Sequence, residues 1–460
     1  MKPDISLRRQ LTGYFILIAI ACLSLTLRIS PLARTNLSWA FDQDSIGYVR
    51  LADGLKSGCG FAPRLAAGGC GPAEVERTPG YPFFLSLFHD TRSVLVVQAV
   101  LGTAVCFLVA LFAWRQWGFA AGVLAELITA LDLSSIINNS VGTEILFTFF
   151  ATLAILLLLK MISVRAAGMP AIIGALSVGC LLGLAQLVRP IAQVLLIVVP
   201  LAMVAMPVPW PRRLAWSALA LILPAAAIGG WSYRNLSQRG VWTFSSIGAV
   251  NLYYYRAAGV LARESGHSVY EVQSDLLRAE GRETEAPDLW SKTADENPAE
   301  MERRGLRIIM SHPWTFTVMS IRALTRNSVM PPNRPAVSAF FGHEADQREA
   351  NSFLTKDVFS SLKSTLDSPW LLGIRALLAF QSAVTLFMWT GVALAIYRLR
   401  DRTSPDVWLI AIPLCASLLL LGAAAGPEMN DRFRVPVVPM LALVAAFGWT
   451  AKPRRKATPV

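Results

Sequence analysis

Two aspartates, Asp42 and Asp44, stand 12 and 14 residues after the end of the long apolar run 11–30. A carboxylate that is held at a membrane surface and partly dried by its neighbours can act as a general base on a hydroxyl group. Tyr48 and Leu51 follow Asp44 at helical spacing, which predicts a short helix that begins near Asp44. Asp is also a common helix N-cap, and a pair of aspartates can fill both roles.

Arginines stand near the ends of other apolar runs, at Arg77, Arg189, Arg432 and Arg434. Guanidinium groups donate paired hydrogen bonds to phosphate oxygens and offset the charge that builds up on a phosphate leaving group. Arg77 precedes a stiff, proline-rich turn that contains Tyr81. From its position Arg77 could bind a phosphate at headgroup depth or serve as an interfacial anchor.

A third acid, Glu144, opens the apolar run 144–160. An acid at a helix N-terminus is favoured by the helix dipole and needs no function there. Together with Asp42 and Asp44 it could bind a divalent metal, although the residue pattern requires no metal or other cofactor. The four histidines show no metal-ligand spacing, so we assign no metal site.

Two of the six cysteines, Cys59 and Cys70, lie in the first long hydrophilic segment. Their spacing does not indicate zinc, because no second cysteine or histidine pair stands nearby. An oxidising compartment would allow them to pair, so we expect a disulfide between them.

The composition indicates the kind of structure that positions these side chains. Of the 460 residues 54% are hydrophobic and only 16% are charged, whereas soluble domains carry about 25% charge. Much of the surface must therefore face lipid. The net charge of +12 does not indicate nucleic acid, because the basic residues form short clusters between apolar runs.

We predict an all-α polytopic membrane protein with about ten transmembrane helices, within a range of 10 to 13. A helix needs about 20 apolar residues to cross the hydrocarbon core of a bilayer. The candidate segments are 11–30, 93–113, 118–137, 144–160, 170–187, 191–206, 213–231, 371–397, 406–425 and 436–450.

Lys and Arg in the short connections fall on one side under this ten-span arrangement, which indicates that both termini are cytoplasmic. The acids and the four arginines then lie on the extracytoplasmic side of the plasma (inner) membrane. We expect an N-terminal transmembrane module, 1–235, with a catalytic outer loop, 31–92. An extracytoplasmic loop domain, 236–370, C-terminal transmembrane helices, 371–450, and a basic cytoplasmic tail, 451–460, follow.

Within the outer domain, residues 269–282 and 298–311 read as polar helices. Residues 313–329 place Trp314, Val318, Ile321 and Leu324 on one helical face. Such an amphipathic helix suits the lipid surface, but it could equally pack on its own domain. Residues 331–369 are rich in proline, serine and charge and read as loop.

At these residues the sequence resembles the membrane glycosyltransferases that use polyprenyl-phosphate sugars, in particular the protein O-mannosyltransferase and lipid A aminoarabinose transferase superfamily with its C-type glycosyltransferase fold. The resemblance covers roughly 11–235 and 371–450. The matching elements are Asp44 with Tyr48, Leu51 and Ala52; Arg77 with Pro79, Tyr81 and Pro82; Glu144 with Leu146 and Phe147; Arg189 with Pro190; and Arg432 with Phe433 and Pro436.

The resemblance implies an inverting transfer of a sugar, hexosyl or pentosyl, from a polyprenyl-phosphate donor to a hydroxyl group of a glycan, lipid or protein acceptor. Asp44 would be the base, with Asp42 as the second choice. Arg77, Arg189, Arg432 and Arg434 would hold the phosphate. Tyr48, Tyr81 and Glu144 would contact substrate. Membrane lipid would surround the chain, and no nucleic acid partner is implied.

Two other classes of protein remain open at this level. A transporter or flippase would place ionisable residues near the middle of the bilayer, whereas the acids here lie at the ends of the predicted spans, on one side of the membrane. A polymerase or ligase of lipid-linked glycans would also have a large outer loop, but would leave the Asp44 segment unexplained.

Overall fold

The computed structural model describes residues 7–65, 68–281, 297–329, 331–332, 337, 369–400, 406–427 and 431–451. Within them every regular element is a helix, and the only strand-like pairing is an isolated bridge between Arg64 and Cys70. The all-α prediction is confirmed for this part of the chain.

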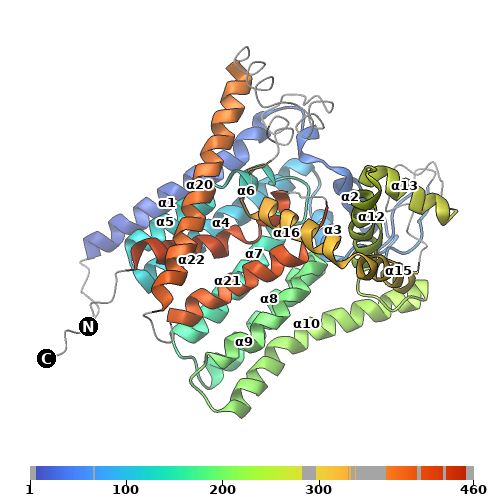
Figure 1. The fold of residues 1–460 in the computed structure, drawn as a ribbon. Coiled ribbons are helices and arrows are strands. Elements are labelled where there is room, and N and C mark those ends of the chain that lie inside the picture. Colours follow the sequence, from blue (N-terminus) through green and yellow to red (C-terminus); the bar gives the residue numbers. More distant parts are fainter. Residues whose placement is uncertain are drawn as a thin grey trace.

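Long apolar helices form a bundle that runs across Figure 1. Seven of the described helices are long and apolar enough to cross a membrane: α1 (Leu7–Ile29), α4 (Thr91–Trp117), α7 (Glu144–Ser163), α8 (Met169–Val188), α10 (Trp210–Arg239), α20 (Pro369–Leu399) and α21 (Asp406–Ala423).

Three apolar segments in the bundle are shorter: α5 (Phe119–Ala130), η3 (Pro190–Ile197) continued by α9 (Val198–Val204), and α22 (Val438–Thr450). At about 1.5 Å per residue in α-helix and about 2 Å in the 3₁₀-helix η3, they span roughly 18 to 27 Å, less than the hydrocarbon core of about 30 Å. All ten predicted segments are thus helical, while the number of crossings stays a prediction.

Close approach between helices depends on glycines in this bundle. A Cβ on Gly448 of α22 would stand 1.8 Å from the carbonyl oxygen of Gly391 on α20. A Cβ on Gly179 of α8 would stand 2.6 Å from the carbonyl oxygen of Ala220 on α10. Small residues allow backbones to pack closely in membrane bundles, where the apolar surroundings give little hydrophobic drive. The core therefore centres on α22, which is buried from Val438 to Gly448.

Shorter elements gather at one end of the bundle, opposite the beginning of α1 and the end of α22 (Figure 1). They are η1 (Ser30–Ala33), η2 (Ser38–Ala40), α2 (Gln43–Lys56), α3 (Gly80–Ser86), α6 (Leu133–Ile137), α11 (Ile247–Val250), a π-helical segment η4 (Asn251–Ala257), α12 (Ala258–Ser265), α13 (Val269–Ala279), α15 (Pro298–Ser311), α16 (Pro313–Val329) and η5 (Asp431–Arg434).

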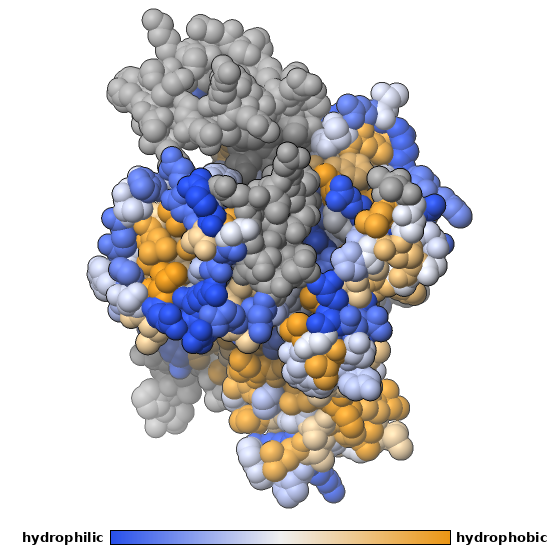
Figure 2. All heavy atoms as spheres, turned by 90° about the vertical axis from the view of Figure 1, so that its right-hand side faces the viewer, coloured by the Kyte–Doolittle hydropathy of each residue, from blue (hydrophilic) through white to orange (hydrophobic). Residues whose placement is uncertain are grey.

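Figure 2 looks at this end, where hydrophilic residues surround small hydrophobic patches and a larger hydrophobic area lies toward the bottom. The predicted disulfide between Cys59 and Cys70 is present and closes the loop after α2. The division of the chain at 235 and 370 stays a prediction, and most of 331–369 and the tail 452–460 lie outside the described residues.

The predicted helices of the outer domain are present as α13, α15 and α16. On α16 the buried side chains include Met319, Ala323 and Asn327, whereas Trp314 and Ile321 are exposed. The helix therefore packs on its own protein with one face and leaves part of the predicted apolar face outward, while Val318 and Leu324 are half-buried. Contact of that outward face with lipid stays a prediction.

Candidate active site

The start of α2 is fixed by Asp42, which caps it. One carboxylate oxygen of Asp42 accepts the backbone N–H of Ser45 at 2.8 Å, and the Ser45 hydroxyl oxygen accepts the backbone N–H of Asp42 at 2.9 Å. The Ser45 hydroxyl also lies 2.6 Å from the carbonyl oxygen of Val141, and the Val141 N–H donates to Ala40 at 2.8 Å. This capping box holds the first turn of α2 against the segment that leads into α7.

The next acid in the chain, Asp44, lies in the first turn of α2 and is free of the capping role. One of its oxygens accepts a hydrogen bond from Arg432, 388 residues away, at 2.8 Å. Its other oxygen accepts no hydrogen bond from any described residue. The side chain retains 25% of its accessible surface. Asp44 therefore has a carboxylate oxygen available to a hydroxyl group.

Three acids and two arginines meet here, and we call Asp42, Asp44, Glu144, Arg189 and Arg432 the ionic cluster. Arg432 lies 3.4 Å from Asp42 and 3.9 Å from Glu144, in addition to its bond with Asp44. Glu144 accepts a hydrogen bond from Arg189 at 2.6 Å. The cluster thus joins α2, α7, η5 and the residue that follows α8.

Arg77 lies beside the cluster, flat against α2. Its guanidinium carbon is 5.4 Å from the ring centre of Tyr48, a cation–π distance. A Cβ on Gly47 would stand 2.6 Å from that carbon, so the glycine makes room for the guanidinium. Glu74 and Glu76 lie 3.8 Å from the same side chain. Arg77 is therefore held one turn along α2 from Asp44.

A second glycine brings the Arg77 loop to Arg189. A Cβ on Gly80, the first residue of α3, would stand 2.7 Å from the backbone of Leu187 at the end of α8. Tyr81 packs edge-on against Tyr48 at 5.1 Å and donates a hydrogen bond from its hydroxyl to Gln98 at 2.8 Å. The two predicted tyrosines, buried Tyr81 and half-buried Tyr48, therefore lie together next to Arg77.

The electrostatics of the two aspartates differ. Burial alone would raise the pKa of Asp44, but the guanidinium groups of Arg432, Arg77 and Arg189 outweigh it and hold that pKa below its ordinary value. For Asp42, burial outweighs Arg432 and raises the pKa. Burial, with the charge of Asp44, also raises the pKa of Tyr48 to about 12. Asp44 is thus ionised and Tyr48 neutral near pH 7.

The fourth predicted arginine, Arg434, is not in the cluster. It is 1% exposed and donates a hydrogen bond to Asp132 on the other side of η5, at 2.9 Å. A 3₁₀-helix has three residues per turn, so residues two apart face different directions. The structure therefore brings Arg77, Arg189 and Arg432 together and sets Arg434 apart.

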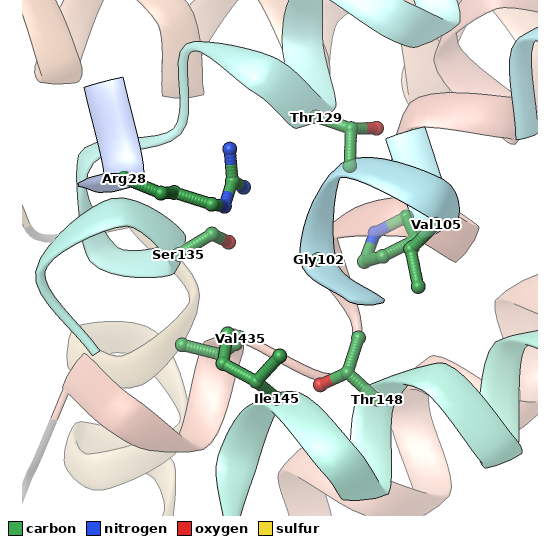
Figure 3. A pocket seen from close by; sticks show the side chains of 9 residues that line it. Arg28, Gly102, Val105, Thr129, Ser135, Ile145, Thr148 and Val435 are labelled. Atoms are coloured by element: carbon green, nitrogen blue, oxygen red, sulfur yellow. The ribbon is translucent and has the colours of Figure 1, made fainter. Parts of the chain in front are cut away.

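A small cavity on the bundle side of the cluster was not foreseen from the sequence. Arg28, Ser135, Ile145, Thr148 and Val435 are among its lining residues, as Figure 3 shows. Arg28 donates to the backbone carbonyl oxygen of Ser24 at 3.2 Å and is almost fully buried. The signal available in the sequence was an arginine inside the predicted first span.

A divalent metal fits the three carboxylates poorly. Asp42 and Asp44 share the guanidinium of Arg432, and Glu144 is bonded to Arg189. No group of three or more potential metal-ligating His, Cys, Asp or Glu side chains occurs in the part of the chain that the structure describes. A metal would have to displace Arg432 to reach both aspartates.

Comparison with known proteins gives matches among solved structures. No protein-family model and no curated protein matches the chain. The oligosaccharyltransferase AglB of Archaeoglobus fulgidus, in complex with an inhibitory peptide and a dolichol-phosphate, matches with a TM-score of 0.52 and 13% identity over 96% of this chain. The apo form of the oligosaccharyltransferase from the same organism matches with a TM-score of 0.50 and 14% identity over 96% of this chain.

The chain spans about half the length of these oligosaccharyltransferases, 50% and 51% respectively. At such low identity the likeness concerns the course of the helices and not the site residues. It agrees with the fold that the sequence predicts: this chain is an integral membrane protein with the C-type glycosyltransferase fold.

Proposed function

We propose that this protein is an inverting glycosyltransferase that moves a sugar from a polyprenyl-phosphate donor to a hydroxyl acceptor at the extracytoplasmic face of the plasma (inner) membrane. The observation that carries the proposal is the position of Asp44: it contacts Arg432, is close enough to Arg77 and Arg189 for their charges to lower its pKa, and has one carboxylate oxygen that no described residue hydrogen-bonds. A base beside several guanidinium groups suits a reaction that deprotonates an alcohol and releases a phosphate.

In this mechanism Asp44 takes the proton of the acceptor hydroxyl group. The oxygen of that hydroxyl group attacks the anomeric carbon of the sugar. The bond between that carbon and the phosphate oxygen breaks on the opposite face, which inverts the configuration. The polyprenyl phosphate leaves with the electron pair, and Arg77, Arg189 and Arg432 offset its charge. Asp42 is the weaker choice of base, because its carboxylate forms the cap of α2.

The lipid part of the donor explains why such an enzyme would be a membrane protein. A polyprenyl chain buries many methylenes, at about 0.8 kcal/mol each, and cannot leave the bilayer to reach a soluble enzyme. The dolichol-phosphate bound to the similar archaeal oligosaccharyltransferase supports a donor of this kind. The acceptor class, glycan, lipid or protein, stays open, because half of that enzyme has no counterpart here.

We further propose that the reaction needs no metal, because each of the three acids already lies beside Arg432 or Arg189. Turnover in the presence of a chelator should equal turnover without it. A loss of activity that Mg²⁺ or Mn²⁺ restores would contradict this and would assign a metal to the acids.

The function can be tested with the full-length protein in liposomes. Undecaprenyl phosphate carrying a labelled hexose, pentose or aminopentose is supplied with a membrane extract as acceptor source, and release of undecaprenyl phosphate is measured. Release that depends on the protein and on the extract is expected for at least one donor. If no donor is turned over, while the protein moves the intact lipid between leaflets, the flippase alternative is favoured.

A further inference from the structure

A buried hydrogen-bond network lies on the inward side of η5. One oxygen of Asp132 accepts hydrogen bonds from Arg434 and from Gln381, each at 2.9 Å. The other oxygen accepts the backbone N–H of Ser135 at 2.9 Å. Asp132 and Arg434 are each 1% exposed. A buried charge pair is stable only when its remaining hydrogen-bonding groups also find partners, and most of those of Asp132 do.

The network joins parts of the chain that are distant in sequence. Gln381 lies on α20 and accepts the backbone N–H of Leu133 in α6 at 2.6 Å. Thr385, one turn further along α20, accepts hydrogen bonds from Arg434 at 3.0 Å and from Gln381 at 3.1 Å. The side chains of Asp132, Gln381, Thr385 and Arg434, which we call the η5 anchor, thus tie η5 to α6 and α20.

The backbone connects the η5 anchor to the ionic cluster over a short distance. Arg432 and Arg434 are two residues apart, which in a 3₁₀-helix is a rise of roughly 4 Å. The next residues are also fixed, since the Val437 N–H donates to the carbonyl oxygen of Arg434 at 2.9 Å and Val435 is fully buried. Little freedom is left to the backbone of Arg432 while Arg434 stays in place.

We propose that the η5 anchor positions Arg432, so that one guanidinium group can reach Asp42, Asp44 and Glu144 together. Arg434 and Asp132 are positioning residues and touch neither donor nor acceptor. Arg434 therefore acts on the site only by positioning Arg432, and it does not bind the donor phosphate. The inference rests on the proposed function wherever its effect is measured as turnover.

A positioning role differs measurably from a purely structural one. Arg432 helps to hold the pKa of Asp44 down. If the anchor is broken and Arg432 moves away, the pKa of Asp44 rises and the acidic limb of the pH–rate profile shifts to higher pH. A loss of general stability would lower the amount of active enzyme without moving that limb.

The test compares Asp132→Asn and the milder Thr385→Val with Thr152→Val. Thr152 is a buried threonine on α7 whose hydroxyl has no partner among the described residues. For each folded variant in liposomes we would measure kcat, KM for undecaprenyl-phosphate sugar, the pH–rate profile and the hydrogen–deuterium exchange of 431–437.

We expect Asp132→Asn to lower kcat at least tenfold, to move the acidic limb to higher pH and to speed exchange in 431–437. Thr385→Val should do the same to a smaller extent, and Thr152→Val should do none of these. If Asp132→Asn does not fold, Thr385→Val decides. Unchanged exchange in 431–437, or faster exchange with an unmoved acidic limb, would overturn the inference.

The outcome can be separated from failure of the proposed function. If the wild-type protein transfers no sugar from any donor, the proposed function fails. The anchor is then decided by exchange alone: faster exchange in 431–437 of the Asp132→Asn variant supports it, and unchanged exchange overturns it.

Discussion

Each face of η5 carries an arginine paired with carboxylates, but the two faces differ in how far these groups are buried. On the inward face Arg434 and Asp132 form a pair that is 1% exposed and shared with Gln381 and Thr385. On the outward face Arg432 is 22% exposed and spreads one guanidinium over three acids, one of which has an oxygen that no described residue hydrogen-bonds. A fully buried pair stabilises a position, whereas a partly exposed one is accessible to a ligand.

Sensitivity to substitution should follow this difference. Changes on the outward face should alter chemistry and leave the fold intact, because partly exposed ion pairs contribute little to stability. Changes on the inward face should alter both, because removing one partner leaves a buried charge unpaired.

The largest effect is expected from Asp44→Asn on the outward face. An amide cannot take a proton from the acceptor, and loss of a general base costs about 10²–10⁴-fold in rate. The variant should keep its thermal stability and its binding of undecaprenyl phosphate, as measured by native mass spectrometry. Asp42→Asn, which keeps an oxygen for the cap, should lose much less. Equal losses in the two variants would contradict the assignment of the base.

Arg432→Gln should come next, and it should change the pH dependence as well as the rate. Without this guanidinium the pKa of Asp44 rises, because the largest influence that lowers it is lost. The carboxylate is then protonated at a higher pH, so the acidic limb of the kcat/KM profile should move to higher pH. A profile that loses amplitude without shifting would show that Arg432 does not control Asp44.

Arg189→Ala should lower kcat or raise KM for the donor by about 10- to 150-fold. The estimate corresponds to about 1.5–3 kcal/mol for a hydrogen bond to a charged group. Arg278→Ala, which breaks an exposed pair with Asp275, is the matched control and should change neither constant. Unchanged kinetics in Arg189→Ala would remove this residue from the phosphate site.

The smallest effect is expected from Gly47→Ala. The added methyl group would meet the Arg77 guanidinium and displace it from Tyr48. We expect KM for the donor to rise by about three- to tenfold and kcat to fall as well, since Arg77 both holds the phosphate and offsets the charge that develops on it. Gly229→Ala, at a position with no atom within 4 Å of the added Cβ, should be neutral. An unchanged KM in the Gly47 variant would exclude Arg77 from donor binding.

Much of the helical framework could be predicted because hydrophobic length and proline or aspartate boundaries are local signals. Helices were expected at 298–311 and 313–329, and α15 and α16 have these bounds. The outward face of α16 could not be predicted, because its buried side, with Met319 and Ala323, depends on which elements pack there.

Site residues could be predicted where the residue type alone limits the chemistry. They could not be predicted where the role depends on the direction in which the side chain points. Asp44, Arg77 and Arg432 stand near apolar runs, where charges are costly unless they are used. Arg434 has the same signal, and only the turn of η5 sends it to Asp132. Asp132 itself looks like an ordinary helix cap in sequence, a role that it also fills for α6.

The most direct measurement is a structure of the full-length protein in a lipid nanodisc with undecaprenyl phosphate. We expect phosphate density within hydrogen-bonding distance of Arg77, Arg189 and Arg432, with the Asp44 oxygen that Arg432 does not bind facing open space beside it. Phosphate bound at the opposite end of the helices, or Asp44 separated from all three arginines, would contradict it.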